Sequence, residues 1–306
     1  MRSLIIHNID AGFGSSAIFE FERELVSRGD ECVLRALEVD TPVADVLTDA
    51  EDFDLVVISG GDGTATNALY TLRNRNVPVC VFPSGTANLL FTNLGNAAEP
   101  KAIAQACLKM RPTPLDVGEL RWIDETGAAH TQGFGIMSGM GFDAQIMESA
   151  RAGKQTLGEA AYFTAVLSHL RPAISEFTIT VDGVTHKRSG ISCIVANSAI
   201  IQGDINVMPG CTMDDGKIDV MLLATTDAFQ LLAPIFAGII DPLGDLIGRP
   251  GIERFSGREF RISSSLPLPL QRDGDSLGVT VTGYEASCIP SAIQVIVDEH
   301  SPYWRA

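Results

Sequence analysis

The chain has 306 residues and 45% of them are hydrophobic, which is enough to bury large cores and favours two domains over one. Lys and Arg number 22 against 38 Asp and Glu, so the formal charge is −16. Binding to a nucleic-acid backbone needs a basic face, so this balance argues against a nucleic-acid partner. It also gives no general attraction to an anionic lipid surface.

The six cysteines are scattered, without a C-x-x-C pair or a compact metal spacing, so we expect free thiols. The first ten residues do not resemble a signal peptide. The most apolar run, Phe229 to Ile240, is far shorter than the roughly 20 residues that a membrane span requires. We therefore expect a cytoplasmic protein.

The first part of the chain alternates between strand and helix patterns, which predicts a parallel sheet covered by helices on both faces. The expected elements before residue 54 are a strand at Ser3 to Asn8, a helix at Ser15 to Arg28 and a strand at Cys32 to Leu37. A further helix is expected at Glu99 to Met110.

A first glycine turn follows the apolar run Leu55 to Ile58, which suits a strand buried on both faces. The turn reads GGDGT from Gly60 to Thr64 and opens a helical pattern through Asn74. Glycine lets a ligand approach the backbone, and a helix start presents N–H groups to an anion. A carboxylate there can hold a magnesium ion that holds phosphate. The alternative is a tight turn in which Asp62 only caps a helix.

A second glycine turn repeats this design about twenty residues later. The buried-strand run Val77 to Phe82 ends in Pro83, Ser84, Gly85, Thr86, Ala87 and Asn88, before a short helix, LLFTNLG. Two such turns on neighbouring parallel strands would face one crevice at the carboxyl ends of the strands. Neither turn is a Walker loop, because no Gly-Lys-Ser/Thr follows.

From Leu115 onward short strand patterns predominate, which predicts an antiparallel sandwich. We place the boundary near Asp116, with an α/β domain at 1–116 and a β-rich domain at 117–306. Helices near Leu157 to Leu170 and Asp227 to Ile240 interrupt the strands. The expected strands are Leu115 to Trp122, His130 to Ser138, Glu176 to Val181, Gly190 to Asn197, Ile218 to Leu223, Glu259 to Ser264, Val279 to Thr282 and Ala292 to Val297.

The ordered set of motifs carries a resemblance that runs nearly end to end. The set comprises GGDGT at Gly60, PSGTANLL at Pro83, LDVG at Leu115, GFDA at Gly141, VAN at Val195, DDGKID at Asp214 and RDGD at Arg272. It resembles the diacylglycerol kinase catalytic-domain family, which includes bacterial lipid kinases and sphingosine kinases, and is more distantly similar to NAD kinase. The resemblance implies a Rossmann-like parallel-sheet domain followed by a mostly antiparallel β-sandwich. It also implies an active site in the cleft between them, and a C-terminal tail that returns to the first domain.

The resemblance implies that ATP is bound by the turns after the first, third and fourth strands. The first turn departs from the family's Asn-Pro-x-Ser-Gly, because here it reads Asn8, Ile9, Asp10, Ala11 and Gly12. The predicted nucleotide-binding residues are Asn8, Gly12, Gly60, Gly61, Asp62, Gly63, Thr64, Gly85, Thr86 and Asn88.

Three Asp-Gly pairs look much alike in the sequence. Asp182-Gly183 lies between two strand patterns and predicts a hairpin without chemistry. For the second pair, the resemblance implies a structural magnesium ion bound by Asp215 and by the backbone carbonyls of Thr212 and Lys217. Oxygen ligands from a turn suit this hard cation.

In the third pair, Asp273-Gly274, the resemblance implies that the following residue is the proton acceptor. The family has Glu there and this chain has Asp275, one methylene shorter. A general base must lie within about 2.6 to 3.2 Å of the hydroxyl it deprotonates, so the backbone has to come closer or a water has to intervene. Asp62 is the competing candidate, because the matching Asp has that role in sphingosine kinases.

We therefore predict an ATP-dependent, magnesium-using kinase that transfers the γ-phosphoryl group to a diacylglycerol-like lipid alcohol. Transient contact with the inner membrane face and a homodimer both stay open. One alternative is NAD kinase, although its family usually carries an Asn-Glu pair after the first glycine turn. The other is a nucleotide-binding or lipid-binding protein without catalysis, which the altered turn at Asn8 and the change to Asp275 would suit.

Overall fold

The computed structural model describes residues 1–11, 16–141, 172–201, 205–225, 230, 232–241 and 243–305. Gly12, residues 142–144 of the GFDA motif and the helix expected at 157–170 lie outside the described residues. The chain divides into two compact units, Met1–Val117 with Ile289–Ala306, and Gly118–Cys288. Each unit is described by itself below.

The first unit alternates strands with helices up to its fourth strand, as expected from the sequence. Its elements are β1 (Arg2–Asn8), α1 (Ala17–Val26), β2 (Glu31–Leu37), the 3₁₀ turns η1 (Asp45–Leu47) and η2 (Ala50–Asp52), β3 (Leu55–Gly60), α2 (Asp62–Leu72), β4 (Val79–Pro83), α3 (Leu89–Leu94), α4 (Pro100–Lys109) and the start of β5 (Pro112–Ile123).

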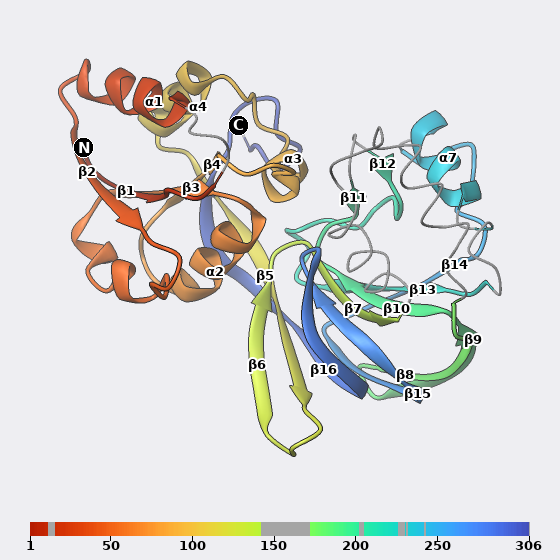
Figure 1. Cartoon of the computed structure of the whole chain (residues 1–306). Helices are drawn as coiled ribbons and strands as arrows, with labels where there is room; N and C mark the ends of the chain where they lie inside the picture. Colours follow the sequence, from red (N-terminus) through yellow and green to blue (C-terminus); the bar gives the residue numbers. More distant parts are fainter. Residues whose placement is uncertain are drawn as a thin grey trace, which may run out of the picture. The chain divides into compact units, whose positions relative to one another are not determined.

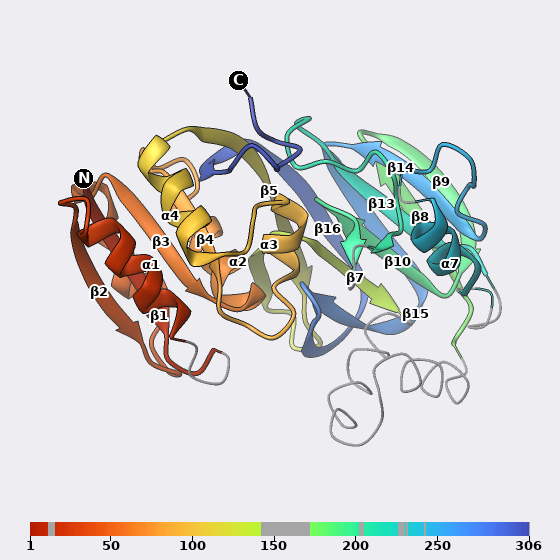
Figure 2. The same cartoon turned by 90° about the horizontal axis from the view of Figure 1, so that it is seen from above.

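The four strands of this unit pair in the order β2-β1-β3-β4, all parallel, and Val295 adds the end of a later strand beside β4. All six residues of β3 are buried, which confirms the strand buried on both faces. Helices α1 and α4 lie side by side on one face of this sheet and α2 lies on the other (Figures 1 and 2). The covering helices explain why the strands are apolar without alternation.

The second unit is built from antiparallel pairs, also as expected. Its elements are the end of β5, β6 (Ala129–Phe134), β7 (Met137–Gly141), β8 (Ser175–Val181), β9 (Val184–Gly190), β10 (Ser192–Ala196), β11 (Ile200–Ile201), β12 (Ile205–Asn206), β13 (Ile218–Leu223), α7 (Leu232–Ile240), β14 (Ile252–Gly257), β15 (Glu259–Arg272) and most of β16 (Asp275–Ile296).

The main sheet of the second unit runs β14-β13-β10-β7-β15-β16, and β8 extends β15 toward β9. One large cluster of buried apolar side chains forms the main core of this unit and includes Phe134, Phe177, Phe260 and Leu270, each almost fully buried. A smaller cluster around Ile194 packs on the opposite side of β10. The alternation of buried and exposed residues in β8 reflects one face on this core and one face in solvent.

The strands expected at 279–282 and 292–297 are wrong as separate elements, because β16 is one strand of 22 residues. Gly278, Gly283 and Pro290 indicate breaks in the sequence. The strand nevertheless continues, since β15 pairs with its first half and β4 with Val295. Register shifts between Ser263 and Leu268 absorb the irregularity. Partners distant in sequence therefore override local breakers.

Candidate functional site

In the strand order β2-β1-β3-β4, the chain runs outward from β1 to β2 on one side and outward from β3 to β4 on the other. The place between β1 and β3 is therefore a topological switch point. In open α/β sheets, ligands bind outside the carboxyl ends of the strands at such a point. The register aligns these ends: His7 of β1 lies beside Ser59 of β3, and Gly60 lies beside Pro83 of β4. The turns predicted to bind nucleotide follow directly from these aligned ends.

A chain of polar side chains links the three strand ends. His7 Nδ1 lies 2.9 Å from Ser59 Oγ, which lies 2.7 Å from Ser84 Oγ. Burial lowers the pKa of His7 from its ordinary value of 6.5, so the imidazole is neutral near pH 7. Asn8 Nδ2 donates to Thr64 Oγ1 at 2.9 Å, which ties the end of β1 to the start of α2. The strand ends are therefore cross-linked by neutral hydrogen bonds.

The two glycine turns touch each other. A Cβ on Gly85 would lie 2.5 Å from the Cα of Gly61, closer than two carbons can pack. A Cβ on Gly60 would lie 2.7 Å from the Cβ of Thr64. Gly61 differs, because the nearest atom to its added Cβ would be 3.6 Å away and its φ is −83°. Gly60 and Gly85 are thus required by packing, whereas packing alone does not require Gly61.

Asp62 connects the two turns through its carboxylate. It is the first residue of α2, and its Oδ1 accepts the Leu90 N–H at 2.8 Å, so it caps the start of α3 from across the turn. Asn88, which precedes α3 with φ 50°, does not cap it. Its amide instead accepts the Gly85 N–H at 2.7 Å and donates to the Gly85 carbonyl at 2.8 Å. The capping role that the sequence offered as an alternative is therefore present, but for the neighbouring helix.

These contacts involve seven of the ten predicted nucleotide-binding residues, and Gly63 and Thr86 lie in the same two turns. Gly12 lies outside the described residues. Thr86 is exposed, whereas Gly61, Asp62 and Thr64 are half-buried. Their contact with a nucleotide remains a prediction.

The turn that carries Asp275 is held in place by its neighbour in the sequence. Asp273 and Gly274 have φ of 48° and 84° and close a two-residue hairpin in which Arg272 faces Asp275. The buried carboxylate of Asp273 accepts three backbone N–H groups, from Gly135 at 3.0 Å, Ile136 at 2.8 Å and Met137 at 3.0 Å. Its own N–H donates to the Met137 carbonyl at 2.7 Å.

Asn197, the last residue of the VAN motif, also holds residues 135 and 136, through their carbonyl groups. Asn197 Nδ2 donates to the Gly135 carbonyl at 3.1 Å, and its backbone N–H donates to the Ile136 carbonyl at 2.8 Å. Asp275, half-buried at the start of β16, thus follows a rigid turn. Its role as a base remains a prediction.

The turn expected to hold a structural magnesium ion is compact. Asp215 is exposed, and its Oδ1 accepts the Lys217 N–H at 3.0 Å. Thr212 Oγ1 donates to Asp214 Oδ1 at 2.7 Å. Nearby Asp219 is buried and forms two hydrogen bonds with Arg254, at 2.9 and 2.7 Å. Among the described residues no three His, Cys, Asp or Glu side chains cluster as metal ligands, so a cation here would depend on backbone carbonyls.

Comparison with known proteins assigns both units. Residues 136–297 match the YegS C-terminal NAD kinase beta sandwich-like domain, and residues 2–120 match the diacylglycerol kinase catalytic domain. The chain belongs to the diacylglycerol kinase family. The expected family and fold class are therefore confirmed, including the sandwich-like character of the second part. Membership makes the chain an ATP-dependent kinase with a lipid-like alcohol as acceptor.

Individual relatives agree with this family. A Mycobacterium tuberculosis protein named diacylglycerol kinase is 25% identical over 268 residues, which cover 82% of this chain and 79% of that protein. A Stenotrophomonas maltophilia protein named probable lipid kinase YegS-like is 28% identical over 259 residues, covering 79% of this chain and 78% of its own.

Solved structures share the fold. The crystal structure of a diacylglycerol kinase from Bacillus anthracis has a TM-score of 0.72 at 17% identity and covers 97% of both chains. Yeast NADH kinase in complex with NADH has a TM-score of 0.54 at 13% identity, covering 99% of this chain and 85% of the yeast chain. In the described part of the kinase, no helix has both the length and the apolar character needed to cross a membrane.

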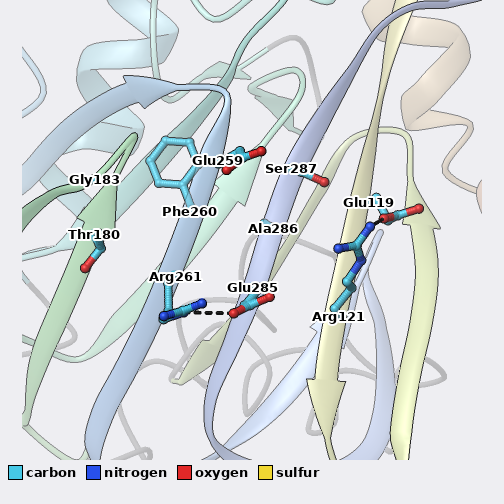
Figure 3. Close-up of a pocket in the computed structure, with 10 residues that line it drawn as sticks. All are labelled: Glu119, Arg121, Thr180, Gly183, Glu259, Phe260, Arg261, Glu285, Ala286 and Ser287. Atoms are coloured by element: carbon cyan, nitrogen blue, oxygen red, sulfur yellow. Dashed lines mark hydrogen bonds and ion pairs between the residues drawn. The ribbon is translucent and has the colours of Figure 1, made fainter.

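A pocket of about 360 Å³ lies in the second unit of this kinase (Figure 3). Four of its charged side chains form two pairs: Arg261 Nε donates to Glu285 Oε1 at 2.8 Å, and Arg121 pairs with Glu119. None of the predicted site residues lines it. Because both of its arginines are already paired with glutamates and no predicted site residue lines it, we assign this pocket no chemical role.

Several residues that organise the site were missed in the sequence. His7 and Ser59 lie outside the motifs, and only their position at the ends of apolar strands could have indicated them. Ser84 belongs to PSGTANLL but was not predicted as a site residue. Asp273 belongs to a recognised Asp-Gly pair, yet its three N–H partners lie about 140 residues earlier, at 135–137. No local pattern reports such a contact.

Proposed function

We propose that this kinase transfers the γ-phosphoryl group of ATP to a diacylglycerol-like alcohol, with magnesium, and that the two glycine turns bind the nucleotide phosphates. The observation that carries the proposal is the contact between Gly61 and Gly85, since it joins two helix-opening turns, the first of which follows β3 beside the switch point. Both turns lead into helices, and the first N–H groups of a helix attract anions. At α3 the Leu90 N–H already binds the Asp62 carboxylate, so α2 is the helix whose start is proposed to face the phosphates.

On the nucleotide side, Gly61 is the residue whose absent side chain leaves space that no neighbour uses. Phosphate oxygens can therefore approach its N–H and those at the start of α2. The exposed Thr86 adds a hydroxyl on the facing turn, and Thr64 adds another, oriented by Asn8. The polar chain through Ser59 and Ser84 keeps the strand ends at a fixed spacing.

For magnesium, two carboxylates suit the ion. Asp62 is half-buried and held by the Leu90 N–H through Oδ1, which orients the carboxylate at the phosphate turns. Asp215 is exposed on a turn whose carbonyls at Thr212 and Lys217 would complete an oxygen set. A bound magnesium ion would offset charge on the transferring phosphoryl group.

The acceptor hydroxyl loses its proton to Asp275 or to Asp62. Phosphoryl transfer depends mostly on positioning and charge stabilisation, so a rigidly held carboxylate suits the role. The Asp275 turn is rigid because Asp273 fixes it, and Asp62 is fixed through α3. The pH–rate profiles of Asp275→Asn and Asp62→Asn distinguish the two, because only loss of the base removes the acidic limb of the profile.

The acceptor is tested by offering ATP with diacylglycerol, with NAD and with a lipid extract in parallel reactions. We expect phosphatidic acid from diacylglycerol and no NADP. Formation of NADP would support the NAD kinase alternative, for which the fold shared with yeast NADH kinase is the specific observation. ATP binding without phosphorylation of any acceptor would support a non-catalytic binding protein.

A further inference from the structure

The helix α7 has no polar side chain at any of its nine positions, LAPIFAGII. A helix that is apolar all round is normally buried in a core or in lipid. This helix is much too short to span a membrane, and Asp241 ends it. Its composition therefore calls for an apolar environment on more than one side.

One side of α7 is packed within the second unit, where the helix lies beside β12 (Figure 1). Ala237 is buried, and a Cβ on Gly238 would lie 2.8 Å from Ile205 and 2.9 Å from the Asn206 carbonyl. After the helix, Gly244 packs on Pro209, where its added Cβ would lie 2.6 Å from the ring. The helix and the turn after it are thus closely held by residues 205–209.

The end of α7 and the turn after it expose apolar side chains. Ile240, Leu243 and Leu246 are 71%, 76% and 89% exposed, and Ile247 is exposed as well. We call these four residues the apolar tip. Four of the thirteen exposed large hydrophobic residues found among the described residues fall in this stretch of eight, so they form a cluster rather than scattered surface residues. Clusters of this kind mark surfaces that contact a partner or a membrane.

The backbone N–H groups of residues 244–247, in and beside the apolar tip, are all hydrogen-bonded to one side chain of the same unit. The buried carboxylate of Asp241 accepts four N–H groups, with distances of 3.1 Å to Gly244, 3.3 Å to Asp245, 2.8 Å to Leu246 and 2.7 Å to Ile247. These bonds also lower the pKa of Asp241, the Ile247 N–H most strongly, so the carboxylate stays ionised in neutral solution.

Arg249 holds the turn from the other direction. Its guanidinium donates to the carbonyls of Asp241 at 2.7 Å, Ile247 at 2.9 Å and Asn206 at 3.0 Å. A segment that enters an apolar medium must have its backbone polar groups paired, since each unpaired group costs several kcal/mol there. The turn meets this condition at four consecutive N–H groups, while its leucines point outward.

We infer that the apolar tip inserts into the surface of a lipid bilayer and docks the kinase where its acceptor resides. This inference rests on the proposed lipid acceptor. Exposed apolar side chains of a segment that lies at the membrane interface can bury themselves at the boundary between headgroups and acyl chains. The chain carries a formal charge of −16 and Asp245 directly precedes Leu246 of the tip, so the favoured surface is zwitterionic or uncharged rather than anionic.

The test uses the full chain and sedimentation with vesicles of phosphatidylcholine, alone or mixed with phosphatidylglycerol. We expect the wild type to bind phosphatidylcholine vesicles, with no gain from phosphatidylglycerol. The double variant Leu243→Ser with Leu246→Ser should bind at least about 10-fold more weakly, because two leucines leave the acyl region. Val184→Ser is the matched control, since Val184 is a 61% exposed apolar residue of the same unit, in β9. It should bind as the wild type does.

Both variants change exposed side chains, so their thermal unfolding should match that of the wild type. Absence of vesicle binding by the wild type, or equal binding by the double variant, overturns the inference. The inference is also overturned if sedimentation equilibrium shows a concentration-dependent dimer of the wild type and of Val184→Ser but not of the double variant. That result would assign the tip to contact with a second copy of the chain. The readout does not use catalysis, so vesicle binding without phosphorylation of diacylglycerol would reject the proposed function and keep the docking surface.

Discussion

The two acidic turns of this kinase, at Gly60–Gly63 and at Asp273–Asp275, use their carboxylates differently. At the first turn, Asp62 Oδ1 accepts one N–H of the neighbouring helix α3. The backbone of this turn is held mainly by the packing of Gly61 against Gly85. At the second turn, Asp273 is buried and accepts three backbone N–H groups, so its carboxylate is the rigid centre of the turn. The first turn is held by the close packing of two glycines, and the second by hydrogen bonds to a buried carboxylate.

An Asp-Gly pair in the sequence does not by itself indicate whether its carboxylate is buried or which N–H groups it binds. Asp182-Gly183 has φ of 46° and 88°, nearly the same as Asp273-Gly274. Asp182, however, is exposed and accepts the N–H groups of Arg258 and Glu259, at 3.1 and 2.9 Å. The backbone geometry is the same and the burial is opposite, so the two turns should respond very differently to substitution.

The largest effect is expected at Asp62. Asp62→Asn keeps an oxygen that accepts the Leu90 N–H but removes the charge, so turnover should fall by at least about 10²-fold with stability nearly unchanged. Asp62→Ala should lose the same activity and in addition about 1 kcal/mol of unfolding free energy, because the start of α3 loses its cap. Steady-state kinetics and urea unfolding measure the two effects. Wild-type turnover in Asp62→Asn would remove Asp62 from the reaction.

The next effect compares the buried and the exposed Asp-Gly turns. Asp273→Ala leaves three N–H groups without their acceptor and should lower the unfolding free energy by about 3 kcal/mol. Asp182→Ala carries the same penalty for Ala at positive φ, but its freed N–H groups are near solvent, so it should cost about 1 kcal/mol. Equal losses in urea unfolding would contradict the distinction between the two turns.

A smaller effect separates packing from ligand binding at the glycine turns. Gly85→Ala places a methyl group 2.5 Å from the Cα of Gly61 and should cost about 1 to 3 kcal/mol of unfolding free energy. Gly61→Ala meets nothing closer than 3.6 Å, so its stability should change by less than about 0.5 kcal/mol. Its KM for ATP should nevertheless rise, because the methyl group occupies the space proposed for phosphate. An unchanged KM would place the phosphates elsewhere.

The smallest effect concerns pH. The pKa of His7 is lower in the folded chain than its ordinary 6.5, so the unfolded state takes up the proton first as the solution is acidified. The unfolding free energy should therefore fall as the pH drops below about 6.5, and stop falling on this account below the folded pKa. Urea unfolding at about pH 7.5 and pH 5.5 should show a smaller difference in His7→Gln than in the wild type. A larger difference in the variant would contradict the burial of His7.

Much of the first unit follows from local patterns. The run LVVIS before two glycines predicts β3, and all its residues are buried as expected. The boundaries of α1 and α4 differ by only one or two residues from those expected, because Gly29 and Pro100 are local signals. In the second unit, the Asp182-Gly183 hairpin is confirmed, because a two-residue Asp-Gly turn is also a local signal. Strand β16 was not predicted as one element, since its continuity depends on β15 and β4.

The strand-and-helix alternation, the glycine turns and the family are predictable from the sequence alone, because periodicity, glycine content and motif order are properties of the linear chain. Three contacts are visible only in the folded chain: Gly85 packs on Gly61, Asp62 caps α3, and Asp273 binds the N–H groups of residues 135–137. The folded chain also shows that the leucines after α7 face solvent while Asp241 pairs the N–H groups beneath them. Each of these depends on a partner brought close by folding, and hydrogen bonds and packing act at a few ångströms in space, whatever the separation along the chain.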